Sequence, residues 1–338
     1  MSARESIIPV FVPHLGCPND CVFCNQRRIS GEQLPAGPET VKNAIESAAA
    51  FLPQGGKRQL AFYGGSFTAI PVCQQQALLS VAKEYLDRGD IDSVRLSTRP
   101  DAIDDEILHR LRAHGVETIE LGAQSLDDEV LILSGRGHTA EDVENASRLI
   151  KARGFKLILQ MMTGLPGDTP EKDIETAKKI IALKPDGVRI YPTVIVRDTA
   201  LYDMWQAGTY HEHSIEDAVQ VCSELLPLFE AAGIPVIRLG LNPTDDLSGG
   251  DAAAGAYHPA LGEMVKSRIM LKKAEQLMAE TEPGSSLILE VGRGKTSQMT
   301  GQKRCNLDYL KAKYALKELK IKENPALGGE IRLIRIEK

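Results

Sequence analysis

The sequence lacks both a secretory leader and a disulfide framework. Residues 1–5 are polar, and the apolar run that follows them, at residues 7–12, is too short to span a bilayer. The six cysteines are irregularly spaced, and three of them fall within one short motif, which is not the pattern of a disulfide-stabilised secreted protein. These absences predict a soluble protein in a reducing compartment, the cytoplasm.

A fourth cysteine is missing from the densest motif of the chain. Cys17, Cys21 and Cys24 have the spacing CxxxCxxC, and three thiolates on one irregular loop converge on one point. A set of three without a fourth suits a 4Fe-4S cluster with one open iron better than a closed tetrahedral zinc site. A zinc site completed by His14 and a chance group of buried thiols are the alternatives.

Positive charge is scarce in most of the chain and concentrated at its end. The net charge is −6, but residues 264–338 hold 16 Lys and Arg against 9 Asp and Glu, a net charge of +7, so the remainder carries −13. A basic segment on an acidic body predicts contact with a polyanion, although solvated basic surfaces are equally common. Aromatic residues are few, with one Trp in the whole chain, so base stacking by this segment is not expected.

The hydrophobic pattern predicts an α/β fold. At 338 residues and 43% hydrophobic composition, the chain can bury one large core and a small appendage. Apolar runs alternate with helical patterns about every 30 residues, which predicts a partial (β/α)6-type barrel at residues 1–245 and leaves a small basic α+β unit at residues 246–338. The expected strands of the barrel cover residues 7–14, 59–65, 93–100, 118–125, 156–166, 187–193 and 234–241, and the helices between them cover residues 39–52, 73–87, 104–114, 139–153, 170–183 and 214–232.

In such folds the functional groups lie on the loops after the carboxyl ends of the strands. The cysteine loop follows the first expected strand. Glycines at these positions let a ligand approach the backbone closely, and polar side chains there need a polar group to face. The carboxyl ends of the next four expected strands carry Gly64, Gly65 and Ser66, then Ser97 and Arg99, then Gln124 and Ser125, then Gly164, Leu165 and Pro166.

The cysteine motif, with Phe23 directly before its third cysteine, resembles the signature of the radical S-adenosylmethionine (radical SAM) superfamily. The resemblance implies a 4Fe-4S cluster on the three cysteines, SAM bound at the open iron, an external electron donor, and reductive cleavage of SAM to a 5'-deoxyadenosyl radical. Gly64 and Gly65 resemble the glycine motif that receives the amino group of SAM, and the Gly-Leu-Pro turn at residues 164–166 resembles the segment that holds adenine. Phe23 and Ser66 belong to these motifs and are also candidate SAM contacts. Ser97, Arg99, Gln124 and Ser125, at the ends of adjacent strands, suit the ribose hydroxyls and carboxylate of SAM, and loop hydrogen bonding without a ligand is the alternative for them.

A second resemblance concerns residues 97–208. Their motifs Ser-Thr-Arg-Pro-Asp, Gly-Ala-Gln-Ser, Gly-Arg-Gly-His-Thr and Asp-Gly-Val-Arg-Ile-Tyr-Pro-Thr resemble the radical SAM domain of the Elongator catalytic subunit, a family that modifies the wobble uridine of tRNA. This implies tRNA or another RNA as partner, docked on the basic C-terminal unit. Arg189, Tyr191 and Arg197, at the end of the sixth expected strand, are the candidate catalytic residues on the substrate side, with core packing as the alternative for Tyr191. The chain is expected to depart from that family in having no acetyltransferase domain.

Other readings stay open. The Gly-Gly and Gln-Ser motifs also resemble oxygen-independent coproporphyrinogen oxidase, which favours a tetrapyrrole or other small-molecule substrate, and a non-catalytic cluster and SAM sensor or a scaffold is the third possibility. Residues 292–296 lack the spacing of a phosphate-binding nucleotide loop, so this region is expected to contact phosphates by charge. Its cations are Arg293, Lys295, Lys303 and Arg304. Cys73 and Cys222 are expected to be packed, and His138 to be a structural hydrogen bonder.

Overall fold

The computed structural model describes residues 5–12, 17, 21–25, 36–49, 51, 56–241 and 247–335. The chain forms two compact units, one of Met1–Ser214 with Leu228–Tyr257 and one of Ile215–Pro227 with His258–Lys338. The boundary expected from the sequence, between residues 245 and 246, includes positions outside the described residues, so it stays a prediction. Each unit is described separately.

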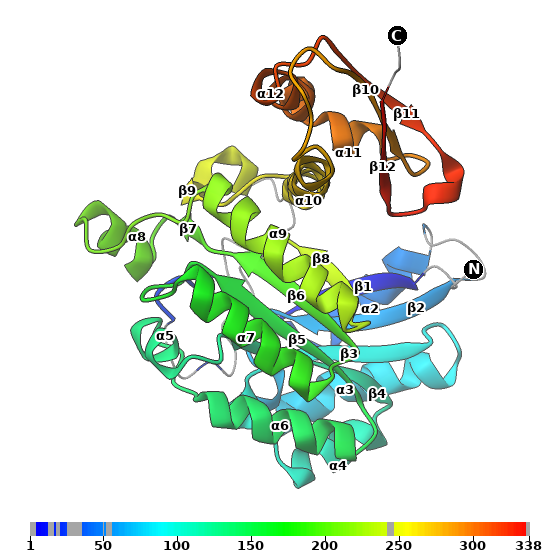
Figure 1. The fold of residues 1–338 in the computed structure, drawn as a ribbon. Helices are drawn as coiled ribbons and strands as arrows, with labels where there is room; N and C mark the ends of the chain where they lie inside the picture. The colour runs from blue at the N-terminus through cyan, green and yellow to red at the C-terminus, as the bar shows by residue number, and fades with distance from the viewer. Residues whose placement is uncertain are drawn as a thin grey trace. The chain divides into compact units, whose positions relative to one another are not determined.

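The larger unit is built on a parallel sheet, which confirms the predicted partial barrel. Within the described residues the sheet has seven strands in the order β1-β2-β3-β4-β5-β6-β8, and each pairs in parallel with its neighbour. Figure 1 shows them side by side in a curved sheet. The strands are β1 (Glu5–Phe11), β2 (Lys57–Tyr63), β3 (Ser93–Thr98), β4 (Val116–Gln124), β5 (Lys156–Thr163), β6 (Gly187–Pro192) and β8 (Val236–Leu239).

Helices connect these strands, and their starts follow from local sequence. The side chains of Asp104, Thr139 and Thr169 accept hydrogen bonds from backbone N–H groups of the first helical turn, which fixes where α4, α6 and α7 begin. In Figure 1, α6 and α7 run along one face of the sheet. The predicted helices of this unit are α2 (Pro38–Ala49), α3 (Val72–Asp87), α4 (Asp105–Ala113), α6 (Ala140–Ala152) and α7 (Pro170–Leu183), and two short helices not predicted are α5 (Asp128–Leu133) and α8 (Ala200–Gln206). The predicted helix α9 (Ile215–Ala231) belongs to the smaller unit as far as Pro227.

The two faces of the sheet differ in chemistry. Successive side chains of a strand point to opposite faces. One face carries fully buried apolar residues such as Phe62, Leu96 and Leu121. The other face carries Arg95 and Glu120, which are only 6% and 3% exposed. The central strands are therefore buried on both faces, and one of these faces is polar.

A small antiparallel pair was not predicted. β7 (Val194–Val196) follows β6 directly and pairs with β9 (Ala252–Gly255), and neither lies in an expected strand. The pair extends the larger unit beyond the end of β6.

Of the two cysteines expected to be packed, one is packed and one is not. Cys222 is buried, as predicted, but Cys73 is exposed near the start of α3.

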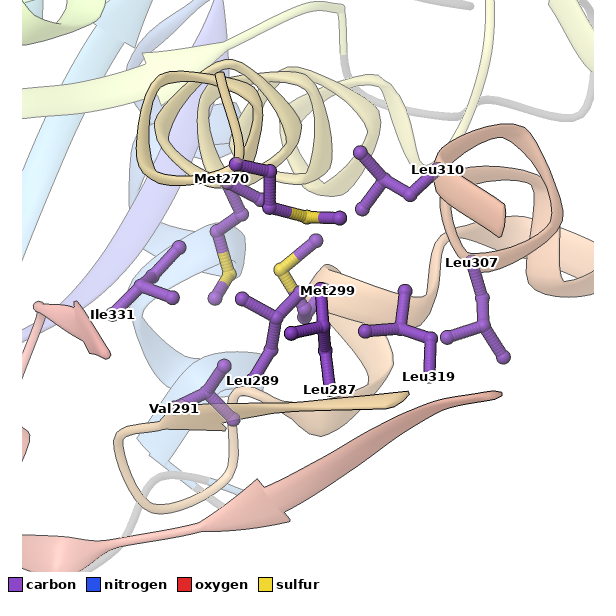
Figure 2. Close-up of a cluster of buried hydrophobic side chains, with 11 residues drawn as sticks. Met270, Leu287, Leu289, Val291, Met299, Leu307, Leu310, Leu319 and Ile331 are labelled. Atoms are coloured by element: carbon purple, nitrogen blue, oxygen red, sulfur yellow. The ribbon is translucent and has the colours of Figure 1, made fainter. Parts of the chain in front are cut away.

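The smaller unit is an α+β structure, as predicted. A three-stranded sheet has the order β11-β10-β12, with β11 parallel and β12 antiparallel to β10. Its core, shown in Figure 2, brings Met270 of α10 and Met299 of α11 against Leu287 and Leu289 of β10. The elements are α10 (Leu261–Leu277), β10 (Ser286–Val291), α11 (Thr296–Thr300), α12 (Cys305–Lys313), β11 (Glu318–Glu323) and β12 (Ile331–Arg335). Among the described residues, no helix of either unit has the length and apolarity needed to cross a membrane.

Candidate functional site

The three cysteines of the motif follow β1, at the edge of the sheet where the strands end (the carboxyl edge). Cys21 is buried, whereas Cys17 and Cys24 are half-buried, and none of the three is in a disulfide. The N–H of Cys24 donates to the carbonyl oxygen of Cys21 at 3.0 Å. The second and third thiols therefore belong to one tight turn.

The two unpredicted helices hold this turn in place. The N–H of Val22 donates to the carbonyl of Ser134, directly after α5, at 3.1 Å, and the N–H of Leu201 in α8 donates to the carbonyl of Val22 at 2.8 Å. Phe23 packs against the buried cluster of Val130, Met162 and Leu165. Backbone bonds and a buried ring thus set the position of the cysteine loop.

Two buried arginines lie beside the cysteines. Nη1 of Arg136 donates to the sulfur of Cys21 at 3.2 Å, and its Nη2 donates to the carbonyl of Gly122 at 2.7 Å. Arg99 donates two hydrogen bonds to Asp101, at 2.9 and 2.8 Å. Burial raises the pKa of the Cys17 thiol and Cys21 raises it further, while the charges of Arg99 and Arg136 act in the opposite direction. Thiols beside two guanidinium groups suit a ligand of negative charge.

The donor set indicates which cofactors fit. Among the described residues, no three His, Cys, Asp or Glu side chains gather closely enough to hold a single metal ion. Three thiols on one loop are instead the ligands of iron–sulfur clusters, and the neighbouring cations offset the charge of such a group. Nη1 of Arg99 is buried and has no hydrogen-bond partner among the described residues, so it can donate to an anionic group such as a carboxylate. These residues therefore fit a 4Fe-4S cluster and the carboxylate of an amino acid.

The glycine pair after β2 exposes backbone. Gly64 and Gly65 have φ angles of 73° and 57°, in the left-handed region that favours glycine. The adjacent Ser66 is fully buried, where its hydroxyl contacts that of Thr98 at 2.9 Å and accepts the N–H of Arg99 at 3.2 Å. Ser66 thus joins the ends of β2 and β3, whereas the half-buried Ser97 lies on the polar face of β3.

The end of β4 is strained. Gln124 has a φ of 65°, which is uncommon for a residue other than glycine, and its Oε1 accepts from Nε2 of Gln160 at 3.0 Å. The buried hydroxyl of Ser125 accepts the N–H of Asp127 at 3.1 Å and lies 3.3 Å from the hydroxyl of Thr176 in α7. Ser125 therefore ties the turn to two helices, while Gln124 lies at the carboxyl edge.

The Gly-Leu-Pro turn after β5 is closely packed. Gly164 has a φ of 72°, and a Cβ at this position would lie 2.2 Å from Cγ of His213. Its carbonyl accepts the hydroxyl of Tyr210 at 2.6 Å, and its N–H donates to Asp168 at 3.2 Å. Leu165 and Pro166 are buried. The turn has one conformation because contacts on both sides fix its first residue.

Two carboxyl groups support that turn. Asp168 and Asp173 share a hydrogen bond. Burial raises the pKa of both groups, and the neighbouring charge of Asp168 raises the pKa of Asp173 further. A hydrogen bond between two carboxyl groups requires a proton on one of them, which removes one of two like charges beside the turn.

The polar face of the sheet contains a charged network around Arg189. Its Nε donates to Glu120 at 3.0 Å, its Nη1 to the hydroxyl of Tyr191 at 3.2 Å and its Nη2 to that of Tyr63 at 3.1 Å. Nη1 of Arg95 lies 4.0 Å from Oε2 of Glu120. Burial raises the pKa of Glu120, whereas the charges of Arg189 and Arg95 lower it. The network places two predicted substrate-side residues together, on β6.

Arg197 lies elsewhere. It directly follows β7, is exposed, and donates through Nε to the carbonyl of Gly250 at 3.1 Å. Its guanidinium carbon lies 5.8 Å from the centre of the Tyr202 ring. The structure thus groups Arg189 with Tyr191 but not with Arg197.

Sequence reasoning missed four residues of this region: Tyr63, Arg95, Glu120 and Arg136. A signal existed for two of them, because Arg95 and Glu120 are charged residues in the middle of otherwise apolar strands. No such signal marks Tyr63, which ends an apolar run. Arg136 was seen only as part of a family motif, and its contact with Cys21 depends on the turn that follows α5.

Comparisons with known proteins are consistent with this site. The family model described as "Radical SAM superfamily" matches residues 11–180, and one described as "Radical_SAM C-terminal domain" matches residues 185–270. The tRNA uridine(34) acetyltransferase of Methanocaldococcus jannaschii is 30% identical over 187 residues, which is 49% of this chain and 35% of that protein. Elongator complex protein 3 of Homo sapiens is 35% identical over 138 residues, which is 40% of this chain and 25% of that protein.

A solved structure supports the fold. Archaeal Elp3 from Methanocaldococcus infernus, with its N-terminus deleted, aligns with a TM-score of 0.63 at 22% identity, covering 86% of this chain and 71% of that one. At this identity the likeness concerns the fold alone. The chain spans about a quarter to a third of the length of the two curated relatives from Methanocaldococcus jannaschii and Homo sapiens.

Replacing Glu120 by glutamine removes the carboxylate that balances Arg189 and Arg95. Breaking a buried ion pair from one side leaves uncompensated charge, so we expect a loss of about 3–5 kcal/mol in the free energy of unfolding. Urea denaturation of the cofactor-free protein, followed by circular dichroism, measures it. Tyr191→Phe removes one hydrogen bond from the same network and is the matched control, with a smaller expected loss. Equal stability of Glu120→Gln and the wild type would contradict the assigned network.

Replacing Asp173 by asparagine tests the carboxyl pair. The pKa of Asp173 is raised in the folded protein, so its contribution to stability is present at low pH and is lost as the pH rises through that value. Asparagine keeps a hydrogen-bond donor at position 173 but has no titratable proton. We expect a higher melting temperature than the wild type at pH 8 and little difference near pH 4, measured by calorimetry. Glu175→Gln, an exposed change on the same helix, should leave the pH dependence unaltered, and an unaltered dependence in Asp173→Asn would refute the shared proton.

Proposed function

Because the chain belongs to the radical SAM superfamily, we propose that it is an enzyme that modifies RNA, with a tRNA uridine as the substrate class. The family uses a 4Fe-4S cluster and SAM, and the bound cluster supplies the electron that cleaves SAM to a 5'-deoxyadenosyl radical. The observation that carries the proposal is the cysteine loop at the carboxyl edge of the sheet, with two buried arginines beside it.

The residues of the carboxyl edge divide the binding of the cofactors between them. Cys17, Cys21 and Cys24 hold the cluster. The SAM carboxylate is proposed to accept from the unsatisfied Nη1 of Arg99, and its amino group to meet the backbone at Gly64 and Gly65. The remaining contacts proposed for SAM come from Phe23, Ser97, Gln124 and the turn formed by Gly164, Leu165 and Pro166. Ser66 and Ser125 act by holding the strand ends, since their hydroxyls are bonded within the protein.

The polar face around Arg189 is the proposed substrate side. Arg189 is fixed by Glu120 and Tyr63, and it orients the hydroxyl of Tyr191. Side chains fixed in this way can position a polar substrate without rearranging. Close packing around them keeps water away from a reactive radical. Arg197, exposed after β7, is proposed to contact the RNA backbone by charge.

RNA as the partner is supported by the name of the Methanocaldococcus jannaschii relative, a tRNA uridine(34) acetyltransferase, and by the smaller unit. That unit has a hollow of about 580 Å³ lined by hydroxyl groups, by the two cations Lys303 and Arg304, and by the carboxylate of Glu323. Glu323 accepts hydrogen bonds from the N–H of Gly294 and the hydroxyl of Thr296. Both cations have left-handed φ angles, 50° and 68°, an uncommon pair for consecutive residues that are not glycine. Such strain is typical of functional loops. We place a phosphate of the RNA backbone against these side chains, near Arg293 and Lys295.

The cellular setting follows from the cofactors. A cluster on free thiols that is reduced by an external electron donor suits a reducing compartment, and we propose the cytoplasm.

The radical chemistry is tested under anaerobic conditions. Protein reconstituted with iron and sulfide, reduced with dithionite and given SAM is expected to form 5'-deoxyadenosine, and total tRNA is expected to increase the yield. Chromatography quantifies the product. Cys21→Ala should abolish it, because two thiols cannot replace three as ligands, whereas Cys73→Ala, the matched exposed cysteine, should not. Product that is indifferent to tRNA would point to a tetrapyrrole or other small molecule, and no product from a fully loaded cluster would favour a sensor.

RNA docking is tested by removing the two strained cations. Lys303→Asn with Arg304→Asn keeps residues that tolerate left-handed backbone and removes two charges. We expect weaker tRNA binding and a shallower salt dependence. The magnitude of the slope of log K against log salt should decrease by about 0.7–0.9 for each phosphate that the protein no longer neutralises. Filter binding across a salt series measures both. Lys320→Gln with Arg332→Gln removes the same charge from the strands of this unit and is the control; identical slopes for the two pairs would argue against docking at this hollow.

A further inference from the structure

Arg136 lies between two glycines whose backbone turns the chain sharply after α5. Gly135 and Gly137 have φ angles of 66° and 69°, and the N–H of Arg136 donates to the carbonyl of Leu131 at 3.0 Å. Left-handed backbone on both sides is readily adopted only by glycine. The turn brings a long cationic side chain back to the cysteine loop, where Arg136 is 8% exposed.

The guanidinium is fixed from two directions. Its Nη2 donates to the carbonyl of Gly122 at 2.7 Å, and its Nη1 donates to the sulfur of Cys21 at 3.2 Å. A Cβ at Gly122 would lie 3.4 Å from Nη2 of Arg136 and 2.9 Å from Nε2 of Gln124, so the missing side chain leaves room for both. A buried cation requires acceptors or negative charge around it, and the Cys21 sulfur is one of the acceptors that Arg136 contacts.

Other groups near the cysteines contribute less net positive charge. The charge of Arg99 is offset by its two hydrogen bonds to Asp101. His138 is buried, with Nε2 3.1 Å from the carbonyl of Ala123. Burial, followed by the charge of Arg136, lowers the pKa of His138 to about 4, so the imidazole is neutral at physiological pH. Arg136 is therefore a cation that touches a cysteine sulfur directly.

We propose that Arg136 is a positioning residue for the iron–sulfur cluster, which orients the Cys21 ligand by a hydrogen bond to its sulfur and raises the reduction potential of the cluster. This inference rests on the proposed function, since it takes Cys21 as a cluster ligand. One-electron reduction by an external donor adds negative charge to the cluster while its ligand bonds persist. A cationic donor bonded to a ligating sulfur stabilises that added charge, and hydrogen bonds to the sulfurs are among the factors that set such potentials.

A redox titration of the reconstituted protein without SAM tests the inference. Dithionite reduces the cluster stepwise, and electron paramagnetic resonance follows the reduced form. In Arg136→Gln we expect at least a tenfold less favourable reduction, which is a midpoint potential about 59 mV more negative. Arg136→Lys keeps the charge and should lie between that value and the wild type. Arg148→Gln, an exposed arginine on α6, removes the same charge at the surface and should not shift the potential.

Iron and sulfide content and the melting temperature are measured for every variant. An unchanged midpoint in fully loaded Arg136→Gln would overturn the inference and leave Arg136 as a structural tie between Gly122 and the loop. If Arg136→Gln loses the cluster, retention by Arg136→Lys supports a role of charge at the ligand, and loss by both variants overturns it. Failure of the wild type itself to bind a cluster would instead reject the proposed function.

Discussion

The structure depends on the position of one short loop, which is set by two backbone hydrogen bonds of Val22. Val22, which directly follows Cys21, donates its N–H to the carbonyl of Ser134, and its own carbonyl accepts from the N–H of Leu201. Loop residues have few local contacts of their own, so bonds from other elements must supply their order. The short helix α8 and the residue that follows the short helix α5 supply these bonds. Without them, three thiols at the right spacing would have no fixed position relative to the sheet.

The polar face of the sheet is the second constraint. Burying Arg95, Glu120 and Arg189 together is unfavourable unless the charges are paired. Here the carboxylate of Glu120 lies against both guanidinium groups, and the hydroxyls of two tyrosines accept hydrogen bonds from Arg189. Such a network adds little net stability compared with an apolar core, because desolvation offsets the attraction. Its value lies in holding polar groups rigid inside a fold, which is what positioning a polar substrate requires.

The fold was predictable from the sequence, and much of the chemistry of the site was not. The seven strands of the main sheet appear as apolar runs of ordinary length, and the caps at Asp104, Thr139 and Thr169 mark helix starts locally. By contrast, α5 has only six residues and α8 seven, too few for a clear period. The contact of Arg136 with Cys21 joins residues 115 positions apart, and the partner of Glu120 is 69 positions away. No local pattern encodes such pairs.

The strand ends show how architecture and ligand binding divide the polar residues. Ser66 and Ser125, which look like ligand contacts in the sequence, have hydroxyls bonded within the protein, where they join strand to strand and turn to helix. The groups that we propose for a ligand include backbone at the glycines and Nη1 of Arg99, which has no hydrogen-bond partner among the described residues. A buried donor without a partner costs free energy in the empty site, and a ligand carboxylate that accepts from it recovers that cost on binding. The serines thus hold the strand ends in place, and the carboxyl edge keeps one buried cationic donor for the anionic group that we propose.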